Sequence, residues 1–455
     1  MEFVNLARGV EIGANSYLIR GRNRSLILDA GMHPKKEGIE ATPDFSLVPD
    51  GSVSAILVTH GHQDHVGMLP ELTRRHPKAK IFMTRATARI ADVMLHNSVN
   101  VMIKQKEEGA GEPLFTHRAV ELSRETWQPC NYHHRFDFTG ERLDDKDGDG
   151  FKFVPAGHIL GAAGVFLRME GVRILFTGDV NFENQTLIRG ANFPEEGVDV
   201  LIMETTRGDN PALPGFSRVK EEERLARAIN EVFARGASVA IPVFALGKTQ
   251  ELLGMVWRMR MRGDLPPNPL YVGGLSTKLT KIYDQLLGDE QRLHPELNLL
   301  QELAPYVLAG NEVAGATVRK RCLYAISSGM MTENTVSNIF ARKVISDPNQ
   351  ALFFIGYSDP DSPAGKIRAA SHGDLIELSA GQPPIPLLCE VKEFSFSAHA
   401  SRESLLNYAV ALKPRKILLV HGGRAAVEWF HMQLYRELPE TEIIIPEPGR
   451  KISLK

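Results

Sequence analysis

The chain has 455 residues, of which 43% are hydrophobic and 24% are charged, and its formal net charge is −2 at pH 7. This composition describes an ordinary globular protein, and the length suggests two or three domains. A nearly neutral chain does not attract polyanions through its overall field. Any contact with nucleic acid must therefore come from a local patch of charge.

The three cysteines, Cys130, Cys322 and Cys389, lie far apart and form no CxxC pair. They are therefore neither a disulfide framework nor a thiolate zinc site, and they fit a reducing compartment. The amino-terminal sequence lacks the layout of a signal peptide. No apolar run approaches the roughly 20 residues that a membrane span needs. We expect a cytoplasmic protein that does not enter membranes.

The first part of the chain is predicted to form short strands joined by turns, at Ser16–Ile19, Ser25–Asp29 and Val53–Thr59. The last of these is a β-branched apolar run of the kind that forms a buried strand. A helix is expected over residues 66–76, and the polar stretch from about residue 97 to 135 has helical patterning. Strands resume at Phe151–Pro155, Gly164–Met169 and Val172–Thr177.

After about residue 210 the pattern changes to alternating helices and strands. Helices are expected at 217–235 and 248–261, and strands at 237–244, 270–272, 321–326 and 351–355. Such alternation implies a small parallel sheet with helices on both faces. Two further strands, at 417–420 and 442–445, flank a helix in the last part of the chain.

A cluster of potential metal ligands directly follows the strand at 53–59. It consists of His60, His62, Asp64 and His65, in the sequence HGHQDH. Imidazole and carboxylate groups are the ligands that Zn²⁺ favours. They bury little apolar surface and compete for solvation, so packing does not explain their crowding. A solvated turn rich in histidine is the alternative, but HxHxDH after a strand is a specific pattern and predicts a metal site.

Four side chains do not saturate two metal ions, so further ligands must come from elsewhere in the chain. His158, Asp179 and His399 each lie at the end of a predicted strand. Taken singly, each is more often a structural residue than a ligand. Their common position at strand ends favours the ligand interpretation for all three.

These residues resemble the motifs of the β-CASP branch of the metallo-β-lactamase superfamily, in particular the group of the cleavage-and-polyadenylation endonuclease and its bacterial and archaeal relatives. Asp29 in LDAGMHP matches the first motif, HGHQDH the second, His158 the third and Asp179 the fourth. Glu204 in LIMETT matches the acidic motif that opens the β-CASP insert, and His399 matches its closing histidine. The resemblance covers essentially the whole chain.

The resemblance implies an α/β fold, in which an αββα sandwich is split by an inserted α/β cap. Residues 1–208 would form the first part of the metallo-β-lactamase domain, residues 209–366 the β-CASP domain, and residues 367–455 the last part of the metallo-β-lactamase domain. The active site is expected in the cleft between the sandwich and the cap.

The resemblance also implies roles for the ligands. His60, His62 and His158 would hold one zinc ion, Asp64, His65 and His399 would hold a second, and Asp179 would bridge them. Two zinc ions per chain would lower the pKa of a shared water and prepare the resulting hydroxide to attack a phosphodiester. Asp29 would fix the ligand loop without touching a metal. His421 in LVHGG either reaches the site from a neighbouring strand end or is a structural residue of a turn.

The chain departs from the family pattern where a proton donor is expected. The family usually has a histidine, oriented by the glutamate that matches Glu204, at a position where this chain has Lys366. Lysine stabilises charge on a phosphate, but its reference pKa of about 10.4 makes it a poor proton donor unless it is desolvated. His372 is an alternative donor, and a solvated surface lysine is the plain alternative for Lys366. Arg207 follows ETT where an aromatic residue is common in the family.

Lys248 is a candidate for binding a substrate phosphate, because it opens a predicted helix where backbone N–H groups are also available. The leading interpretation is a zinc-dependent endoribonuclease acting on single-stranded RNA, with exonuclease activity as an additional mode. His399 favours RNA over DNA, because the DNA-processing branch typically lacks that histidine. A hydrolase of another phosphodiester or a small ester is the second interpretation. A non-catalytic RNA-binding scaffold subunit is the least favoured, because all seven ligands are present. Assembly as a homodimer is left open.

Overall fold

The structure is a computed structural model that describes residues 1–109, 111–144, 148–310 and 312–455. The chain divides into two compact units. Unit 1 consists of residues 1–184, 188–212 and 399–455, and unit 2 consists of residues 185–187 and 213–398. The domain boundaries expected from the sequence stay predictions.

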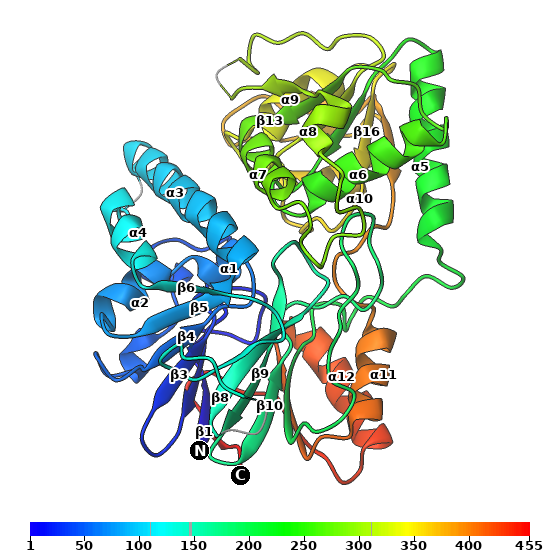
Figure 1. Cartoon of the computed structure of the whole chain (residues 1–455). Helices are drawn as coiled ribbons and strands as arrows, with labels where there is room; N and C mark the ends of the chain where they lie inside the picture. The colour runs from blue at the N-terminus through cyan, green and yellow to red at the C-terminus, as the bar shows by residue number, and fades with distance from the viewer. Residues whose placement is uncertain (110, 145–147, 311) are drawn as a thin grey trace. The chain divides into compact units, whose positions relative to one another are not determined.

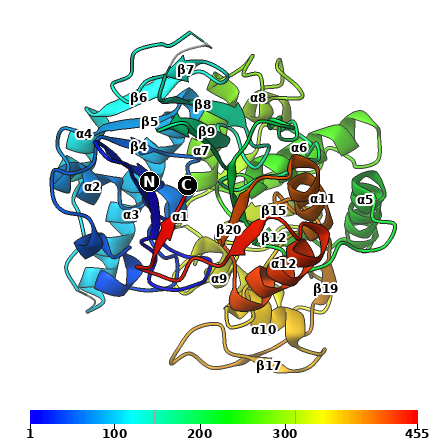
Figure 2. The ribbon, with the colours of Figure 1, turned by 90° about the horizontal axis from the view of Figure 1, so that it is seen from below.

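The first sheet of unit 1 has seven strands in the order β22-β1-β2-β3-β4-β5-β6. Their bounds are Lys451–Ser453, Glu2–Asn5, Tyr17–Arg20, Ser25–Leu28, Ala55–Leu57, Lys80–Thr84 and Trp127–Cys130. Alternate residues of a strand point to opposite faces. Tyr17 and Ile19 of β2 accordingly face the inner core and Leu18 the outer one. The first and the last strand of the chain are neighbours in this sheet, because β1 pairs with β22 (Figure 2).

The second sheet of unit 1 also has seven strands, in the order β21-β20-β11-β10-β9-β8-β7. Their bounds are Glu442–Ile444, Lys416–Val420, Val200–Glu204, Val172–Phe176, Ala163–Met169, Gly150–Pro155 and Arg135–Phe136. Strand β11 pairs in parallel with both β10 and β20, and Glu204 lies opposite Val420. The carboxyl ends of these three strands therefore meet at one edge of the sheet.

Helices cover the outer faces of both sheets, so that unit 1 is an αββα sandwich (Figure 1). Helices α2 (Leu69–Arg75), α3 (Arg85–Glu107) and α4 (His117–Arg124) lie on the first sheet, and α11 (Arg402–Leu412) and α12 (Arg424–Glu437) on the second. A core that includes the fully buried Phe151 and Phe153 fills the space between the sheets. Burial of each such side chain contributes roughly 1.5–3 kcal/mol. The predicted fold class is confirmed.

Unit 2 contains a parallel sheet in the order β14-β13-β15-β12-β16-β19. The bounds are Tyr306–Leu308, Leu270–Gly273, Leu323–Ile326, Val239–Pro242, Ala351–Phe354 and Glu390–Glu393. Its helices are α5 (Arg218–Ala234), α6 (Lys248–Met261), α7 (Gly274–Gln285), α8 (Leu299–Leu303), α9 (Val336–Val344) and α10 (Pro363–Ala369), and a short pair joins β17 (Leu375–Ile376) to β18 (Ile385–Pro386). The alternating pattern of the sequence thus predicted the parallel sheet with helices, whereas β14, β19 and the helices α7 to α10 were not predicted.

Two expected elements differ from the structure. The helix expected over 66–76 begins later, at Leu69. Pro70 lies in its first turn, where proline is tolerated because the N–H groups of that turn have no partner within the helix. The helical pattern expected for residues 97–135 holds for α3 and α4 but is wrong for β6, which pairs in parallel with β5 and places Trp127 in the outer core.

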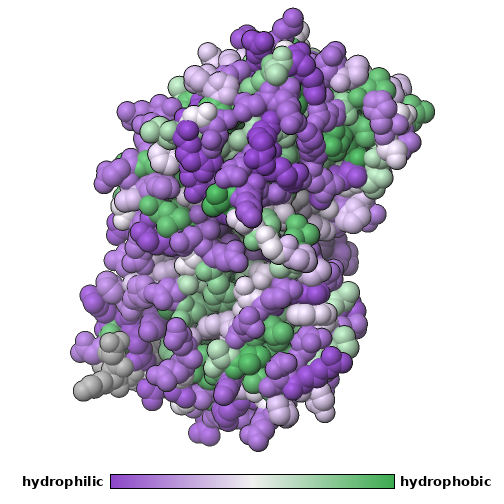
Figure 3. All heavy atoms as spheres, turned by 90° about the vertical axis from the view of Figure 1, so that its right-hand side faces the viewer, coloured by the Kyte–Doolittle hydropathy of each residue, from purple (hydrophilic) through white to green (hydrophobic). Residues whose placement is uncertain are grey.

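The surface is mainly hydrophilic on the face that Figure 3 shows, and hydrophobic residues gather there in small separate areas. Helix α5 illustrates the reason, because Leu225, Ile229 and Val232 recur at helical spacing and are buried. Among the helices that the structure describes, none is both long and apolar enough to cross a membrane.

Candidate metal centre

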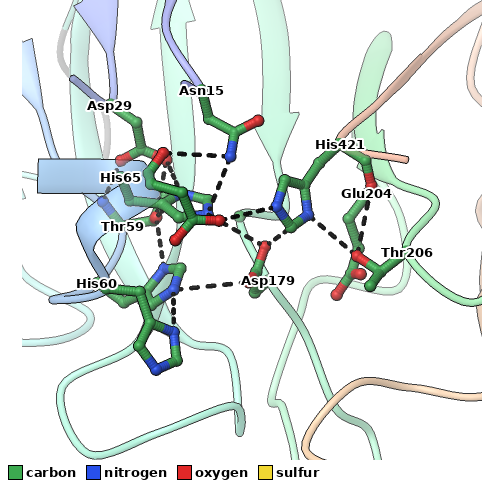
Figure 4. Close-up of polar contacts among 12 residues, drawn as sticks. Asn15, Asp29, Thr59, His60, His65, Asp179, Glu204, Thr206 and His421 are labelled. Carbon is green, nitrogen blue, oxygen red and sulfur yellow. Dashed lines mark hydrogen bonds and ion pairs between the residues drawn. The ribbon is translucent and has the colours of Figure 1, made fainter. Parts of the chain in front are cut away.

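The loop after β4 is held in place by the buried carboxylate of Asp29. Asp29 accepts hydrogen bonds from the backbone N–H of Thr59 (2.7 Å) and from the Thr59 hydroxyl (2.9 Å). Oδ2 of Asp29 also lies 2.7 Å from Nδ1 of His65. The Thr59 hydroxyl also lies 3.0 Å from Nδ1 of His60. With Nδ1 of both imidazoles engaged in these contacts (Figure 4), Nε2 is left to bind a metal ion. Asp29 thus contacts the ligand loop at Thr59 and His65.

The backbone of the loop is clamped from the other side by residues 30–32. Ala30 donates its N–H to the carbonyl of His65, and Met32 donates to that of Gln63, at the start of the short helix α1 (Gln63–Val66). Gly31 lies between these two bonds, and a Cβ atom there would be 1.8 Å from the carbonyl oxygen of Asp64. Only glycine permits this approach, which fixes where the Asp64 side chain begins.

One group of ligand atoms comes from His60, His62, His158 and Asp179. Nδ1 of His62 lies 3.0 Å from Nε2 of His60 and 3.2 Å from Nε2 of His158. Oδ2 of Asp179 lies 3.5 Å from the first of these Nε2 atoms and 3.6 Å from the second. A tetrahedral zinc ion with bonds of about 2.0–2.1 Å requires ligand atoms about 3.3–3.4 Å apart. The spacing of this group therefore fits a zinc ion.

A second group comes from Asp64, His65 and His421. Oδ2 of Asp64 lies 3.6 Å from Nε2 of His65 and 3.3 Å from Nε2 of His421. The other nitrogen of His421, Nδ1, lies 3.0 Å from the hydroxyl of Thr206 and 3.0 Å from Oδ1 of Asp179 (Figure 4). Asp179 therefore faces the first group with one carboxylate oxygen and the second group with the other.

His399 lies beside Glu204 and Asp179. Its Nδ1 lies 3.1 Å from Oε2 of Glu204, and its Nε2 is 4.0 Å from Oδ2 of Asp179. Glu204 is buried and also accepts a hydrogen bond from the backbone N–H of Val180. The structure thus brings His421 closer than His399 to the Asp64 and His65 group, and it pairs His399 with a buried carboxylate.

The electrostatics of the cluster favour a bound cation. Burial raises the pKa of Asp179. Its Oδ1 receives no well-directed hydrogen bond among the described residues, although Nδ1 of His421 is close. Burial alone would lower the pKa of His65, but Asp179, Asp64 and Asp29 outweigh it and raise that pKa to about 10. Burial and the neighbouring imidazoles lower the pKa of His60. Carboxylates that attract positive charge, beside a buried imidazole of His60 that resists protonation, suit a divalent metal ion.

The remaining predicted residues lie in unit 2. Lys248 is the first residue of α6, and its Nζ donates to the backbone carbonyl of Phe396. It lines a small cavity at the carboxyl ends of β12 and β16, beside Phe244 and Tyr357. Lys366 is exposed in the middle of α10, and His372 is exposed just beyond that helix.

The sequence analysis did not identify two residues that contact the cluster. Thr206 contacts His421, and Asn15 donates from Nδ2 to the carbonyl of Asp64 at 3.2 Å. Thr206 is the last residue of the ETT motif, so its position just after a strand was a usable signal. Asn15 precedes β2, and nothing in its local sequence points to a ligand loop 49 residues away.

Comparison with known families agrees with this geometry. A model described as the metallo-beta-lactamase superfamily matches residues 9–228. The Beta-Casp domain model matches residues 249–367, and the model of a Zn-dependent metallo-hydrolase RNA specificity domain matches residues 384–446. The chain therefore belongs to the metallo-β-lactamase-fold hydrolases that carry a β-CASP domain. Within that class it is a Zn-dependent metallo-hydrolase whose His and Asp clusters are intact.

Its relatives include proteins from eukaryotes and archaea. The chain is 30% identical over 441 residues to the endoribonuclease ysh1 of Schizosaccharomyces pombe, covering 93% of this chain and 54% of that protein. It is 28% identical over 444 residues to the cleavage and polyadenylation specificity factor 73 of Drosophila melanogaster, covering 95% of this chain and 61% of that protein. It is 27% identical over 432 residues to the RNase J-like protein of Methanocaldococcus jannaschii, covering 94% of each. The chain thus spans little more than half the length of the first two.

A solved structure shows the same fold at low sequence identity. The crystal structure of a protein of unknown function from Enterococcus faecalis matches with a TM-score of 0.56 and 14% identity, covering 99% of each chain. At this identity the likeness concerns the fold alone.

Proposed function

We propose that this hydrolase cleaves phosphodiester bonds in single-stranded RNA, as an endonuclease. The observation that carries the proposal is Asp179, whose two carboxylate oxygens face two separate groups of ligand atoms. Two metal ions that share a ligand suit in-line displacement at phosphorus. The match to an RNA specificity domain over residues 384–446 and the similarity to a named endoribonuclease favour RNA as the substrate.

We propose two zinc ions per chain. His60, His62, His158 and Asp179 would hold one, and Asp64, His65, His421 and Asp179 the other. Bound zinc supplies Lewis acidity and a water of lowered pKa. In this assignment His421 replaces His399 as the last ligand, because its ring nitrogens lie 3.0 Å from Asp179 and 3.3 Å from Asp64.

The protein's own contribution to bond cleavage is a proton for the leaving oxygen, and His399 is placed to deliver it. Its Nδ1 contacts Glu204, so the ring is oriented with Nε2 toward the metal cluster. A carboxylate at Nδ1 also stabilises the protonated imidazole. Lys366, for which the sequence suggested this role, is exposed on α10. We therefore assign the proton transfer to His399 and its positioning to Glu204.

The test combines metal analysis with cleavage assays. The purified protein is analysed for zinc and incubated with a labelled single-stranded RNA and with bis-p-nitrophenyl phosphate. We expect two zinc ions per chain and internal RNA cleavage, both of which Asp179→Asn reduces. A protein that holds two zinc ions yet cleaves neither substrate would overturn the nuclease proposal and leave the fold and the metal centre standing.

A hydrolase of another phosphodiester is the second candidate, because two metal ions that share Asp179 suit displacement at phosphorus in any phosphodiester. Cleavage of bis-p-nitrophenyl phosphate without cleavage of RNA would select it. Exonuclease activity, assembly as a homodimer and a cytoplasmic location stay predictions.

A further inference from the structure

Arg207 lies on a turn that the structure fixes beside the metal centre. The turn directly follows β11 and Glu204. On one side Thr205 donates its N–H to the carbonyl of His421. On the other side Gly208 packs on α12 so closely that a Cβ atom would be 2.3 Å from the carbonyl oxygen of Ala426. The backbone of Arg207 is therefore anchored between a candidate zinc ligand and a helix.

The guanidinium of Arg207 is half-buried and has no anionic partner in direct contact. Across residues 1–109, 111–144, 148–310 and 312–455, no carboxylate oxygen lies within 4.0 Å of it, and its side chain makes no hydrogen bond. Burial lowers the pKa of the group, and the more distant carboxylates of Glu403, Glu204 and Glu183 only partly offset that effect. Since arginine keeps its charge in proteins, an anion that binds to it would offset the remaining cost of burial.

The nearby carboxylates already have other partners. Glu204 contacts His399 and Val180, as described above. Glu403 accepts from Nε of Arg402 at 3.1 Å and from the N–H of Ala212 at 3.4 Å. Glu183 is exposed on the surface. A substrate anion would therefore not have to displace an existing ion pair to reach Arg207.

Arg402, in the same region, differs from Arg207 because its guanidinium has several protein partners. It donates to Glu403 and to the carbonyl of Gly208, and its guanidinium lies 4.3 Å from the ring centre of Trp429. Arg402 thus supports the turn, whereas Arg207 has its donors available.

We propose that Arg207 binds a phosphate group of the RNA backbone next to the Glu204–His399 pair. The inference rests on the proposed function and names a residue that grips its substrate. A guanidinium offers two parallel N–H donors that match two phosphate oxygens, and such charge-assisted pairs are stronger than neutral hydrogen bonds.

The experiment compares Arg207→Gln and Arg207→Lys with the unmodified protein and a matched control, Arg173→Gln. Arg173 is the second residue of β10 and forms an ion pair with Asp199. It therefore lies at the opposite end of β10 from Asp179. All proteins are analysed for zinc and assayed on one RNA oligonucleotide. Arg207→Gln should raise KM about tenfold or more, with a smaller change in kcat and an unchanged zinc content. Arg207→Lys should recover part of the loss, and Arg173→Gln should behave as the unmodified protein.

Two further readouts separate a phosphate contact from a structural role. The slope of log affinity against log salt should become shallower by about 0.7 in Arg207→Gln, the value for one lost phosphate contact on a single strand. Oligonucleotides with one neutral methylphosphonate each should bind the unmodified protein more weakly at one linkage near the cleavage point, and Arg207→Gln should lose that sensitivity.

The inference is overturned if Arg207→Gln keeps KM within about twofold, a small change against the tenfold effect of a lost charged contact. It is also overturned if this variant loses zinc or responds to each methylphosphonate as the unmodified protein does. If the unmodified protein cleaves no RNA, the proposed function fails, but the binding measurements still show whether Arg207 contacts a phosphate.

Discussion

His399 and Glu204 lie 195 positions apart in the chain, and Nδ1 of the histidine is 3.1 Å from Oε2 of the glutamate. Because this contact occupies Nδ1, the other ring nitrogen faces Asp179. Attraction to His399 outweighs burial and lowers the pKa of Glu204, so the glutamate stays charged beside the imidazole. A buried carboxylate and an imidazole at the edge of the metal cluster have the arrangement that the proposed proton donor requires.

Replacement of His399 by alanine tests that role against the ligand role. We expect kcat for RNA cleavage to fall by about 10²–10⁴-fold, the usual contribution of a general acid. The zinc content should not change, because the proposed ligand sets do not include His399. Single-turnover cleavage and metal analysis on the same sample measure both quantities. Loss of one zinc ion per chain in His399→Ala would instead show that His399 is a zinc ligand.

Neutralisation of Glu204 should move the pH dependence of the rate. A carboxylate beside an imidazole raises the pKa of that imidazole, so Glu204→Gln should lower the pKa of His399. The proton donor is then lost at a lower pH, and the alkaline limb of the kcat profile should move to lower pH. Glu204→Asp, which keeps the charge, serves as the control. An unmoved alkaline limb in Glu204→Gln would argue against proton transfer by His399.

Removal of His421 should cost a metal ion. We expect His421→Ala to retain one zinc ion per chain and to lose most of the second after dialysis against a weak chelator, because a ligand of that ion is gone. His372→Ala is a suitable control, since His372 is exposed in unit 2. Two retained zinc ions in His421→Ala would contradict the assignment.

The exposed lysine of α10 should tolerate substitution. Lys366→Ala is expected to keep kcat within about twofold, since substitutions of solvent-exposed side chains usually have small effects. A fall of about a hundredfold or more at unchanged zinc content, measured with the same RNA, would instead support the role in proton transfer that its sequence position suggested.

The close approach at Gly31 predicts a loss of stability and of metal. In Gly31→Ala the new methyl group would meet the Asp64 carbonyl, so we expect the free energy of unfolding to fall by about 1–3 kcal/mol or more, with weaker zinc binding. Gly111→Ala is the control, because a Cβ atom there meets nothing within 4 Å. Thermal unfolding and zinc titration of both variants decide the question.

The histidine-rich loop was predictable because its ligands are neighbours in the sequence and follow a buried strand. The parallel sheet of unit 2 was predictable because its apolar runs alternate regularly with helices. The sequence did not predict that His421, and not His399, lies beside Asp64. Which of these two reaches Asp64 depends on the register of β11 with β20, where Glu204 pairs with Val420 and brings His421 level with Thr205. That pairing joins segments 216 residues apart, and no local pattern of the chain encodes it.

The pairing of β20 with β11 also governs when the centre can form during protein synthesis. A nascent chain that has left the ribosome as far as Asp179 already carries all four residues of the first group. The second group waits for His421, and until then β11 lacks its neighbour on one side. If each group holds one metal ion as proposed, the site for the first ion is synthesised long before the site for the second. The second site is then complete only after the whole of unit 2 has been made.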